Sequence, residues 1–412
     1  MIDYDKNQFE IIDLYESRLK TYEKAKRDSC DFKFWDEEEQ GCTPEEYREE
    51  LLGGLNPNEK FVLIRYKGSG GEVIIPDGVT SISSQVFRKN ANIKRVYIPD
   101  SVTSMGNEQF YYCTALEEVR LSDNLIMLGA HSFRGCTALK KVYMGKSIIF
   151  IGFDAFYGCS SLKSIDLPPK LEEISSGAFA DTGLEEVYIP ENVENIDAQV
   201  FSYCNNIKKI EVHPQNPYFY SRDNCVYAYK HNMLMIGLND GTIPADGKVG
   251  DIFPEAFEGN HRVTRLTIPN GIKYISSGTF SDCINLRSVI LPDTIESIGP
   301  CAFSRCAALK EIVVPSSVKK IDRFAFESCG LERVVIKRGV KEIGEHVFFK
   351  CNNLKEIFIP STVENLGYDI FDGCGEHVRA YIENGEQNNY ENYKKHLSSV
   401  VVEFTDRHEI FD

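Results

Sequence analysis

Cysteine is the residue type in this chain whose number and spacing most suggest chemistry. The 412 residues include thirteen cysteines, and nine of them follow a phenylalanine by three positions. These nine are Cys113, Cys136, Cys159, Cys204, Cys283, Cys306, Cys329, Cys351 and Cys374. Thiolates act as nucleophiles and as zinc ligands, but no C-x-x-C pair occurs. The shared register therefore predicts an inward-facing ladder of reduced, structural thiols, because cysteine is readily buried as a small side chain.

Histidine and the one short glycine-rich motif form no catalytic pattern. The eight histidines share no register, and neither an H-E-x-x-H nor a G-x-S-x-G sequence occurs. Residues 66–71, YKGSGG, lack the G-K-[ST] ending of a phosphate-binding loop and predict a turn. His213, Cys225 and His231 are close in sequence, but their setting favours a hairpin over a metal site. We therefore expect no catalytic, metal-binding or cofactor-binding residue, no cofactor and no enzyme activity.

The phenylalanines that precede the cysteines define an internal repeat. They are 22 or 23 residues apart in two series, separated by a gap of 56 residues. The series are Phe87, Phe110, Phe133, Phe156, Phe179 and Phe201, then Phe257, Phe280, Phe303, Phe326, Phe348 and Phe371. The outline of one unit is L-x-x-Φ-x-Φ-P-x-x-Φ-x-x-Φ-G-x-x-A-F-x-x-C, where Φ is apolar. Such a period indicates a solenoid, because one short unit cannot bury its own apolar side and must stack on the next.

Each unit contains the pattern of a short strand. The Φ-x-Φ stretch alternates with a period of two, as expected for a strand with one buried face. Proline then ends the strand because it lacks an N–H donor, as at Pro99, Pro190 and Pro315. The spacing of three that follows, together with the Ala-Phe pair, predicts a tight helical turn. The predicted fold class is therefore a repeat solenoid of mostly short parallel β-strands joined by tight helical turns.

These motifs resemble the BspA-like, or Treponema pallidum type, leucine-rich repeat family. The resemblance covers roughly residues 58–404. It includes residues 216–227, NPYFYSRDNCVY, which are similar to a hairpin found in many members. Several members are described as adhesins or as protein-binding surface molecules. The resemblance thus implies a leucine-rich repeat fold and an adhesin-like role.

Three regions are expected along the chain. They are an N-terminal helical cap or appendage at 1–57, the solenoid at 58–386 with an irregular insertion at 213–250, and a C-terminal cap and tail at 387–412. Helical spacing from Ile12 to Tyr22 and a capping box at residues 43–46 predict two N-terminal helices. The C-terminal cap is expected to contain a short helix at 390–396 and a strand at 400–404.

Composition narrows the classes of partner and the compartment. Acidic residues outnumber basic ones by 62 to 46, giving a net charge of −16, which disfavours nucleic acid as a partner. No apolar run approaches the roughly 20 residues of a membrane-spanning helix, so no membrane insertion is expected. The missing signal-peptide pattern and the many unpaired cysteines favour a cytoplasmic, reducing compartment. The family resemblance implies the alternative, a secreted or cell-surface location.

Candidate binding residues lie between the two Φ positions, where strand alternation points side chains away from the core. In the first series of repeats this position alternates tyrosine with charge, and in the second series it forms an apolar stripe. The candidate protein-binding residues are Tyr97, Tyr143, Tyr188, Ile290, Val313, Val335 and Phe358. Aromatic residues and contiguous apolar patches are typical of interfaces. β-branched residues also suit strands intrinsically, so the stripe has a second, structural explanation.

The sequence thus favours a non-catalytic, protein-binding repeat protein whose partner is a protein of unknown identity. The alternative is a structural, self-assembling solenoid that forms a homo-oligomer through the apolar strand stripe. Four tyrosines of the insertion fit either hairpin packing or a binding knob: Tyr218, Tyr220, Tyr227 and Tyr229.

Overall fold

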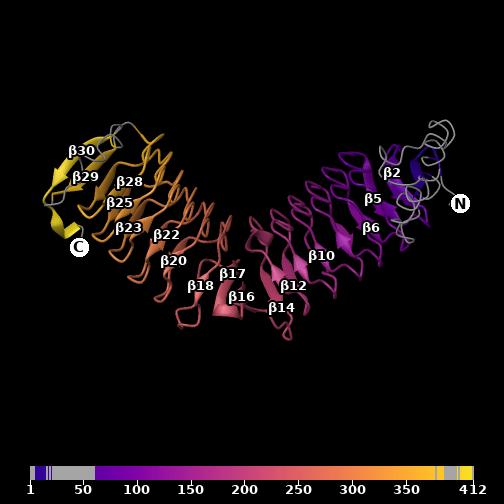
Figure 1. Ribbon diagram of the computed structural model, residues 1–412, viewed down its shortest axis with the longest axis horizontal. Coiled ribbons are helices and arrows are strands. Elements are labelled where there is room, and N and C mark those ends of the chain that lie inside the picture. The colour runs from indigo at the N-terminus through magenta and orange to yellow at the C-terminus, as the bar shows by residue number, and fades with distance from the viewer. Residues whose placement is uncertain are drawn as a thin grey trace, which may run out of the picture. The chain divides into compact units, whose positions relative to one another are not determined.

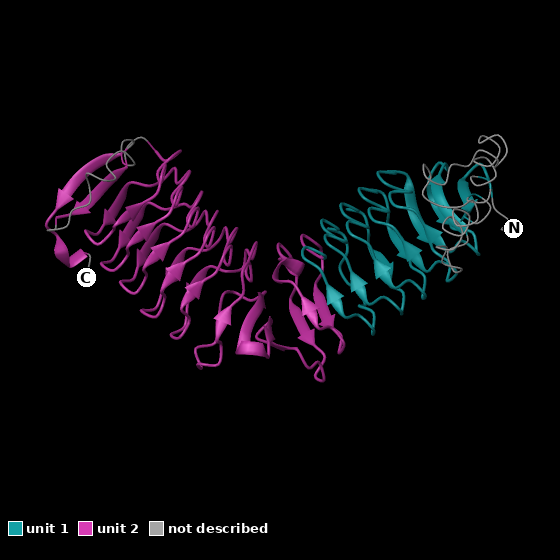
Figure 2. Ribbon diagram, viewed as in Figure 1, with its two compact units in different colours: residues 1–178 teal, residues 179–412 magenta. Residues whose placement is uncertain are grey.

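A computed structural model of the chain describes residues 5–14, 17, 20, 61–375, 378–384, 397 and 400–410. The chain forms two compact units, residues 1–178 and residues 179–412 (Figure 2). Each unit is a stack of coils, and equivalent short strands of successive coils pair in parallel (Figure 1). The fold is a β-solenoid, as the repeat predicts.

The first unit contains two stacks of strands. The Φ-x-Φ stack is β3 (Gly71–Ile74), β5 (Ile93–Tyr97), β7 (Glu118–Arg120) and β9 (Lys141–Tyr143), paired in that order. The other stack is β2 (Phe61–Tyr66), β4 (Ser81–Ile82), β6 (Ser104–Met105), β8 (Met127–Leu128), β10 (Phe150–Ile151) and β11 (Glu173–Ile174). Along the Φ-x-Φ stack Val96 pairs with Val119, which pairs with Val142, and all three are buried.

One coil of the first unit lacks the expected strand. Residues 162–168 have no strand backbone, although Asp166 at the outward position is exposed. Pro168 and Pro169 stand at the end of this stretch. Pro168 stands at the position where proline ends the strands of other coils, as at Pro190 and Pro315, so it does not explain why this strand is missing.

The second unit repeats the arrangement around the insertion. Its Φ-x-Φ strands are β12 (Glu186–Ile189), β14 (Lys209–Val212), β19 (Arg265–Thr267), β21 (Ser288–Ile290), β23 (Glu311–Val314), β25 (Arg333–Ile336), β27 (Glu356–Ile359), β29 (Arg379–Glu383) and β30 (Val401–Thr405). Its other short strands are β13 (Asn195–Ile196), β18 (Asp251–Ile252), β20 (Tyr274–Ile275), β22 (Ser297–Ile298), β24 (Lys320–Ile321), β26 (Glu342–Ile343) and β28 (Asn365–Leu366). The five strands from β23 to β30 form one parallel sheet.

The turns that carry the repeat phenylalanines differ from the helical turns we expected. Residues two before and two after the phenylalanine have positive φ, as at Cys301 (φ 54°) and Arg305 (φ 60°) around Phe303. The backbone N–H groups of these three residues donate to carbonyls of the next coil at 2.7–3.2 Å. A helical turn would direct them along its own axis. These hydrogen bonds between coils offset the strain of left-handed backbone.

One coil does contain the expected helical turn. The 3₁₀ helix η2 (Ala198–Phe201) is capped at its N-terminus by Asp197, whose carboxylate accepts a hydrogen bond from the N–H of Gln199. In this coil the phenylalanine follows the previous one after 22 residues instead of 23.

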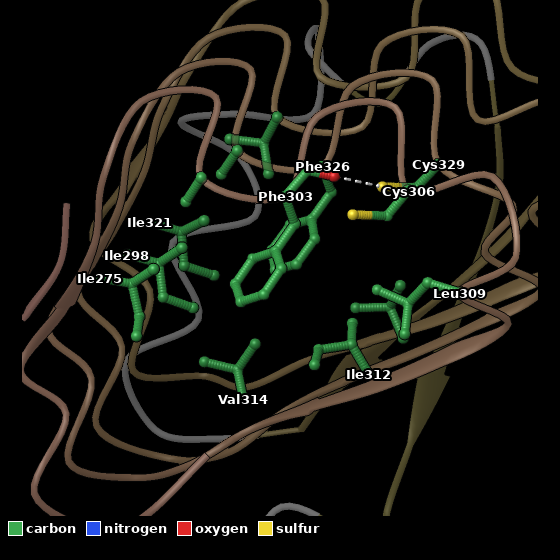
Figure 3. Packing of buried hydrophobic residues seen from close by; sticks show 14 of the residues in the cluster. Ile275, Ile298, Phe303, Cys306, Leu309, Ile312, Val314, Ile321, Phe326 and Cys329 are labelled. Atoms are coloured by element: carbon green, nitrogen blue, oxygen red, sulfur yellow. Dashed lines mark hydrogen bonds between the residues drawn. The ribbon is translucent and has the colours of Figure 1, made fainter. Parts of the chain in front are cut away.

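The phenylalanines form the centre of the core. Within each unit, neighbouring rings stack with centroids 5.0–5.9 Å apart and planes within 26° of parallel. Figure 3 shows Phe303 and Phe326 stacked between the isoleucines of one side of the coil and Leu309 on the other. Each ring fills the space between two coils, and in the second unit one continuous cluster of buried residues runs from Cys225 to Leu397.

The nine registered cysteines also lie in the core. Each thiol lies 2.9–3.3 Å from the backbone carbonyl oxygen of the phenylalanine one coil earlier and donates to it. Eight of the nine are buried and Cys374 is half-buried. Burial raises the pKa of the Cys113 thiol to about 12 and that of Cys374 to about 11. All eleven described cysteines are unpaired.

Each end of the chain adds a strand to the solenoid. Residues Phe9–Asp13 form β1, which pairs antiparallel with β2. Ile12, the first residue of the expected helical spacing, lies in β1, because the edge of β2 offers unpaired backbone groups, and helical backbone occurs at Leu14, Ser17 and Lys20. The other residues of that spacing, Tyr15, Leu19 and Tyr22, lie outside the described residues. At the other end β30 pairs with β29. The predicted second N-terminal helix and the predicted helix at 390–396 lie outside the described residues.

The insertion begins with an antiparallel hairpin. Strands β15 (Phe219–Arg222) and β16 (Cys225–Ala228) are joined by Asp223 and Asn224, both with positive φ, as a tight hairpin turn requires. Strand β17 (Met233–Gly237) pairs with β16 and then, in parallel, with β18. The buried Asn216 side chain donates to the carbonyls of Pro190 and Val193, which ties the hairpin to the preceding coil. The hairpin similarity found in the sequence is thus matched by the structure.

Candidate protein-interaction face

The Φ-x-Φ strands present two columns of side chains on their outward face. The charge column contains Glu72, Arg95, Glu118 and Lys141 in the first unit and Glu186, Lys209, Arg265, Ser288, Glu311, Arg333, Glu356 and Arg379 in the second. The outer column contains Ile74, Tyr97, Arg120 and Tyr143 in the first unit and Tyr188, Glu211, Thr267, Ile290, Val313, Val335, Phe358 and Tyr381 in the second. Register pairs such as Tyr97 with Arg120 and Arg120 with Tyr143 confirm the alignment predicted from the spacing.

The charge column largely neutralises itself. Acidic and basic residues alternate along the parallel register, so that Arg95 pairs with Glu118 and Glu118 with Lys141. In the second unit the Arg333 guanidinium bridges Glu311 at 2.5 Å and Glu356 at 2.8 Å. Exposed ion pairs contribute little stability individually, but opposite charges directly across a sheet favour this register over a shifted one. The column therefore has few uncompensated charges to offer a ligand.

In the first unit, the tyrosines of the outer column lie against cations from both columns. Tyr97 and Tyr143 are each about two-fifths exposed. The Arg120 guanidinium lies 5.6 Å from the centroid of the Tyr97 ring, and the Lys141 ammonium lies 4.3 Å from that of Tyr143. These cations lie against the rings and restrict their rotamers. The face is thus both amphipathic and preorganised, which lowers the entropy lost on binding.

In the second unit the outer column has exposed and covered parts. Tyr188, Ile290 and Val313 are exposed, with Ile290 at 62%. These three candidates lie where the sequence predicts them, on the solvent side of the sheet. An aliphatic side chain this exposed adds little to the core. By contrast Leu266, in the neighbouring strand β19, is fully buried on the opposite face.

The prediction that Val335 and Phe358 are exposed is wrong. Their exposed fractions are 3% and 4%, and they form a small cluster separate from the main core, together with Tyr381 and Ile410. The Phe358 ring stacks on Tyr381 with centroids 4.9 Å apart, and the Arg333 guanidinium lies 5.2 Å from its centroid. Ile410 belongs to the 3₁₀ turn η5 (His408–Ile410), which follows β30. The C-terminal end of the chain therefore covers this part of the outer column.

A buried carboxylate lies beside this cluster. Glu383, at the end of β29, is 1% exposed and accepts hydrogen bonds from Arg338 Nε at 2.9 Å and from the N–H and hydroxyl of Ser361 at 3.0 Å. The ring of His408 contacts the same carboxylate, with Nδ1 at 2.9 Å from Oε1. Burial opposes ionisation of Glu383, but the bonds from Arg338, His408 and Ser361 outweigh it and lower its pKa to about 2.

Sequence reasoning missed this carboxylate group. Arg338 and Glu383 are 45 residues apart and His408 is a further 25 along the chain. Two coils separate the first pair, whereas the repeat aligns residues one coil apart. The signal that could have found it is the acidic residue at 383, which stands at the repeat position that proline occupies in several other coils, as at Pro315 and Pro360.

The other candidate groups do not form a site. Among the described residues, no three histidine, cysteine or acidic side chains are placed to bind a metal. Cys225 is buried in β16 whereas His231 is exposed in the 3₁₀ turn η3 (Lys230–Asn232). Of the insertion tyrosines, Tyr227 is buried and Tyr220 stacks on it with ring centroids 5.2 Å apart, while Tyr218 and Tyr229 are exposed.

The second unit also contains a small cavity. Tyr203, Asn205, Glu258 and Arg262 are among its lining residues. Their polar atoms already have partners within the fold: the Tyr203 hydroxyl donates to Asp282, and Glu258 accepts from Gln199 and Ser202. Asn205 accepts from the N–H of His261. The cavity therefore lacks unpaired groups that would bind a substrate.

In the part of the chain that the structure describes, no helix has both the length and the apolar character needed to cross a bilayer.

Solved structures with the same fold come from bacterial leucine-rich repeat proteins. A leucine-rich cell surface protein of Faecalibacterium prausnitzii is 22% identical, with a TM-score of 0.59 over 82% of this chain and 94% of that one. The pneumococcal vaccine antigen PcpA is 18% identical, with a TM-score of 0.59 over 85% and 95%. A leucine-rich repeat protein of Eubacterium ventriosum is 16% identical, with a TM-score of 0.55 over 78% and 91%. At these identities the likeness shows the fold.

Sequence comparison gives the family. Among curated proteins no significant relative is found. A family model described as BspA type leucine rich repeat region, with six copies, matches residues 67–154, 128–229 and 248–385, which is more than half of the chain. The repeating coil with its buried phenylalanine and cysteine is the structural counterpart of that match. This chain therefore belongs to the BspA-type leucine-rich repeat family.

Proposed function

We propose that this protein is a non-catalytic, adhesin-like binding scaffold that recognises a protein partner through the outer column of its Φ-x-Φ strands. The observation that carries the proposal is the exposure of Tyr97, Tyr143, Ile290 and Val313 on a sheet whose adjacent column alternates acidic and basic residues. Ion pairs form within that column, as between Arg95 and Glu72 and between Arg333 and both Glu311 and Glu356. Large apolar and aromatic side chains that are exposed in register on a rigid surface are typical of interaction sites.

Two further findings support a binding role over catalysis. Leucine-rich repeat proteins are generally non-enzymatic and generally bind proteins. The F. prausnitzii structure is described as a cell surface protein and PcpA as a vaccine antigen, and both share this fold.

The electrostatics of the face indicate the kind of partner. The net charge of −16 gives long-range repulsion of acidic partners. The outer column itself offers rings, aliphatic groups and the exposed cation Arg120. A folded protein with an apolar patch and a neutral to basic rim would fit both features.

Affinity capture with paired variants tests the proposal. The full chain, immobilised, is exposed to protein extract, and the bound proteins are quantified by mass spectrometry for the parent and for two strand-face variants, Tyr97→Ser/Tyr143→Ser and Ile290→Ser/Val313→Ser. The matched control, Tyr112→Ser/Tyr274→Ser, removes two tyrosines that are similarly exposed but lie off this face.

We expect at least one strand-face variant to lose a partner that the control retains, with unchanged circular dichroism. Equal capture by all three variants would contradict the proposal. Recovery of the chain itself as the dominant captured protein, lost in the Ile290→Ser/Val313→Ser variant, would instead support the self-assembling alternative.

A further inference from the structure

The covered part of the outer column shows what this face can bind. Val335 and Phe358 continue the same register as the exposed Val313, since Val313 pairs with Val335 and Val335 with Phe358. Their burial therefore comes from what lies on top of the sheet. Among the described residues, the apolar side chain from outside the sheet that packs on them is Ile410, in the segment of residues 406–410, named here the tail segment.

The tail segment is held to the solenoid by side chains more than by backbone. Its backbone hydrogen bonds to other described backbone groups are local: His408 N–H donates to Asp406 O at 2.8 Å and Ile410 N–H to Arg407 O at 3.1 Å. None of the residues of η5 is buried. The contacts that hold it are Ile410 on the apolar cluster, His408 on Glu383, and a hydrogen bond from the Asn384 side chain to Asp406. A turn held in this way can open without breaking a strand ladder.

The surface beneath the tail segment is formed by the solenoid alone. Phe358 stacks on Tyr381, and Glu383 is held by Arg338 and Ser361, all of which belong to the repeat coils. Arg338 and Ser361 therefore keep the Glu383 carboxylate charged and oriented even without the contact from His408. Glu383 lies beside the apolar surface formed by Phe358 and Tyr381. A ligand can therefore donate a hydrogen bond to the carboxylate and pack an apolar side chain on the two rings.

We propose that Val335, Phe358, Tyr381 and Glu383 form a peptide-binding site and that the tail segment is its internal ligand. The ligand pattern is a hydrogen-bond donor two residues before an aliphatic side chain, as in His408 and Ile410. This inference rests on the proposed function, because it treats the outer column as a binding face. It adds the sequence pattern of the ligand, and it assigns the tail segment the role of covering one part of that face.

Tethering explains why the site is filled. A segment joined to its site by a short connection acts at a millimolar effective concentration, so a weak contact is sufficient for occupancy. A peptide in solution must compete with the tail segment, and its apparent affinity falls accordingly. Weakening the tail segment should therefore expose a site that accepts the same sequence in trans.

The experiment uses the full chain and a labelled peptide with the sequence of residues 405–412, TDRHEIFD. Fluorescence anisotropy compares the parent with the double variant His408→Ala/Ile410→Asp. We expect the variant to bind the peptide at least about tenfold more tightly than the parent. A peptide with aspartate in place of its isoleucine should not bind.

Amide hydrogen exchange of the unmodified chain gives a second test that needs no variant. We expect the tail segment to exchange much faster than β27 and β29, as a displaceable ligand must. Exchange of the tail segment as slow as that of β29, or a folded double variant that binds no peptide, would overturn the inference and make the tail segment a structural cap. Either result would leave the proposed function intact, because that is tested separately at Tyr97, Tyr143, Ile290 and Val313.

Discussion

The thiol of Cys329 lies 2.9 Å from the backbone carbonyl oxygen of Phe303, one coil earlier, and donates a hydrogen bond to it (Figure 3). The same carbonyl accepts the N–H of Cys306 in its own coil at 3.3 Å. Nine of the twelve repeat phenylalanines thus contribute their ring to the core and their carbonyl to the next coil's cysteine. This relationship recurs at all nine registered cysteines and explains why phenylalanine and cysteine keep a spacing of three.

The cysteine ladder should be reduced and unreactive in the native protein. Its thiols donate to carbonyls, and burial raises the pKa of Cys113 to about 12 and that of Cys374 to about 11, so these two carry little thiolate at pH 8. Titration with a thiol reagent should label few groups in the native state, with the half-buried Cys301 among the first, and thirteen after denaturation. Ladder disulfides detected by non-reducing mass spectrometry would contradict this.

Removal of a repeat phenylalanine should destabilise the fold according to its position. Phe303 is stacked on both sides, by Phe280 and Phe326. Phe303→Ala should therefore cost about 3–5 kcal/mol of unfolding free energy. Phe371 stacks on Phe348 at the end of the phenylalanine series, so Phe371→Ala should cost less. Urea denaturation measures both, and equal losses would argue against a stack held together by nearest neighbours.

Glu383 should make the stability depend on acid pH. Its pKa in the folded chain is about 2, below its ordinary value of 4.5. Because the folded state favours the charged form, the stabilisation is complete above about pH 4.5 and is lost as the pH falls towards 2. Glu383→Gln should be less stable than the parent at pH 7, and this difference should shrink below pH 4.5. The exposed control Glu364→Gln should show no such change; a constant difference for Glu383→Gln would disprove the assignment.

The two parts of the apolar stripe should respond differently to the same substitution. Ile290 is exposed, so Ile290→Ser should change the unfolding free energy by no more than about 0.5 kcal/mol. Phe358 is buried under Tyr381 and Ile410, so Phe358→Ser should cost about 2–3 kcal/mol. Thermal denaturation compares the two. Similar small effects would mean that the tail segment does not cover Phe358 in solution.

The regular part of the fold was predictable from the sequence because one local pattern recurs. The spacing of Phe303 and Phe326 indicated the coil, and alternation around Val313 indicated the outward column; both agree with the structure. The turns were mispredicted because the left-handed backbone at Cys301 and Arg305 is stabilised by hydrogen bonds to the next coil. A single repeat unit contains no information on such bonds.

The site was predictable only in part, for a different reason. The repeat pattern places Val335 and Phe358 on the outward face, and they do point that way. Their burial depends on Ile410, which lies beyond the last repeat and follows no period. Contacts between a periodic surface and a non-periodic end of the chain have no signature in the spacing, and the contact between Glu383 and His408 was missed for the same reason.

Oxidative footprinting of the captured complex tests the central claim most directly. Hydroxyl radicals modify exposed tyrosines, and Tyr97, Tyr143, Tyr112 and Tyr274 are similarly exposed in the structure. If the outer column binds the partner, complex formation should lower the modification of Tyr97 and Tyr143, or of Tyr188 in the second unit, several-fold and leave Tyr112 and Tyr274 unchanged. Protection of Tyr112 or Tyr274 with no protection of the three strand-face tyrosines would contradict the account and place the interaction elsewhere on the solenoid.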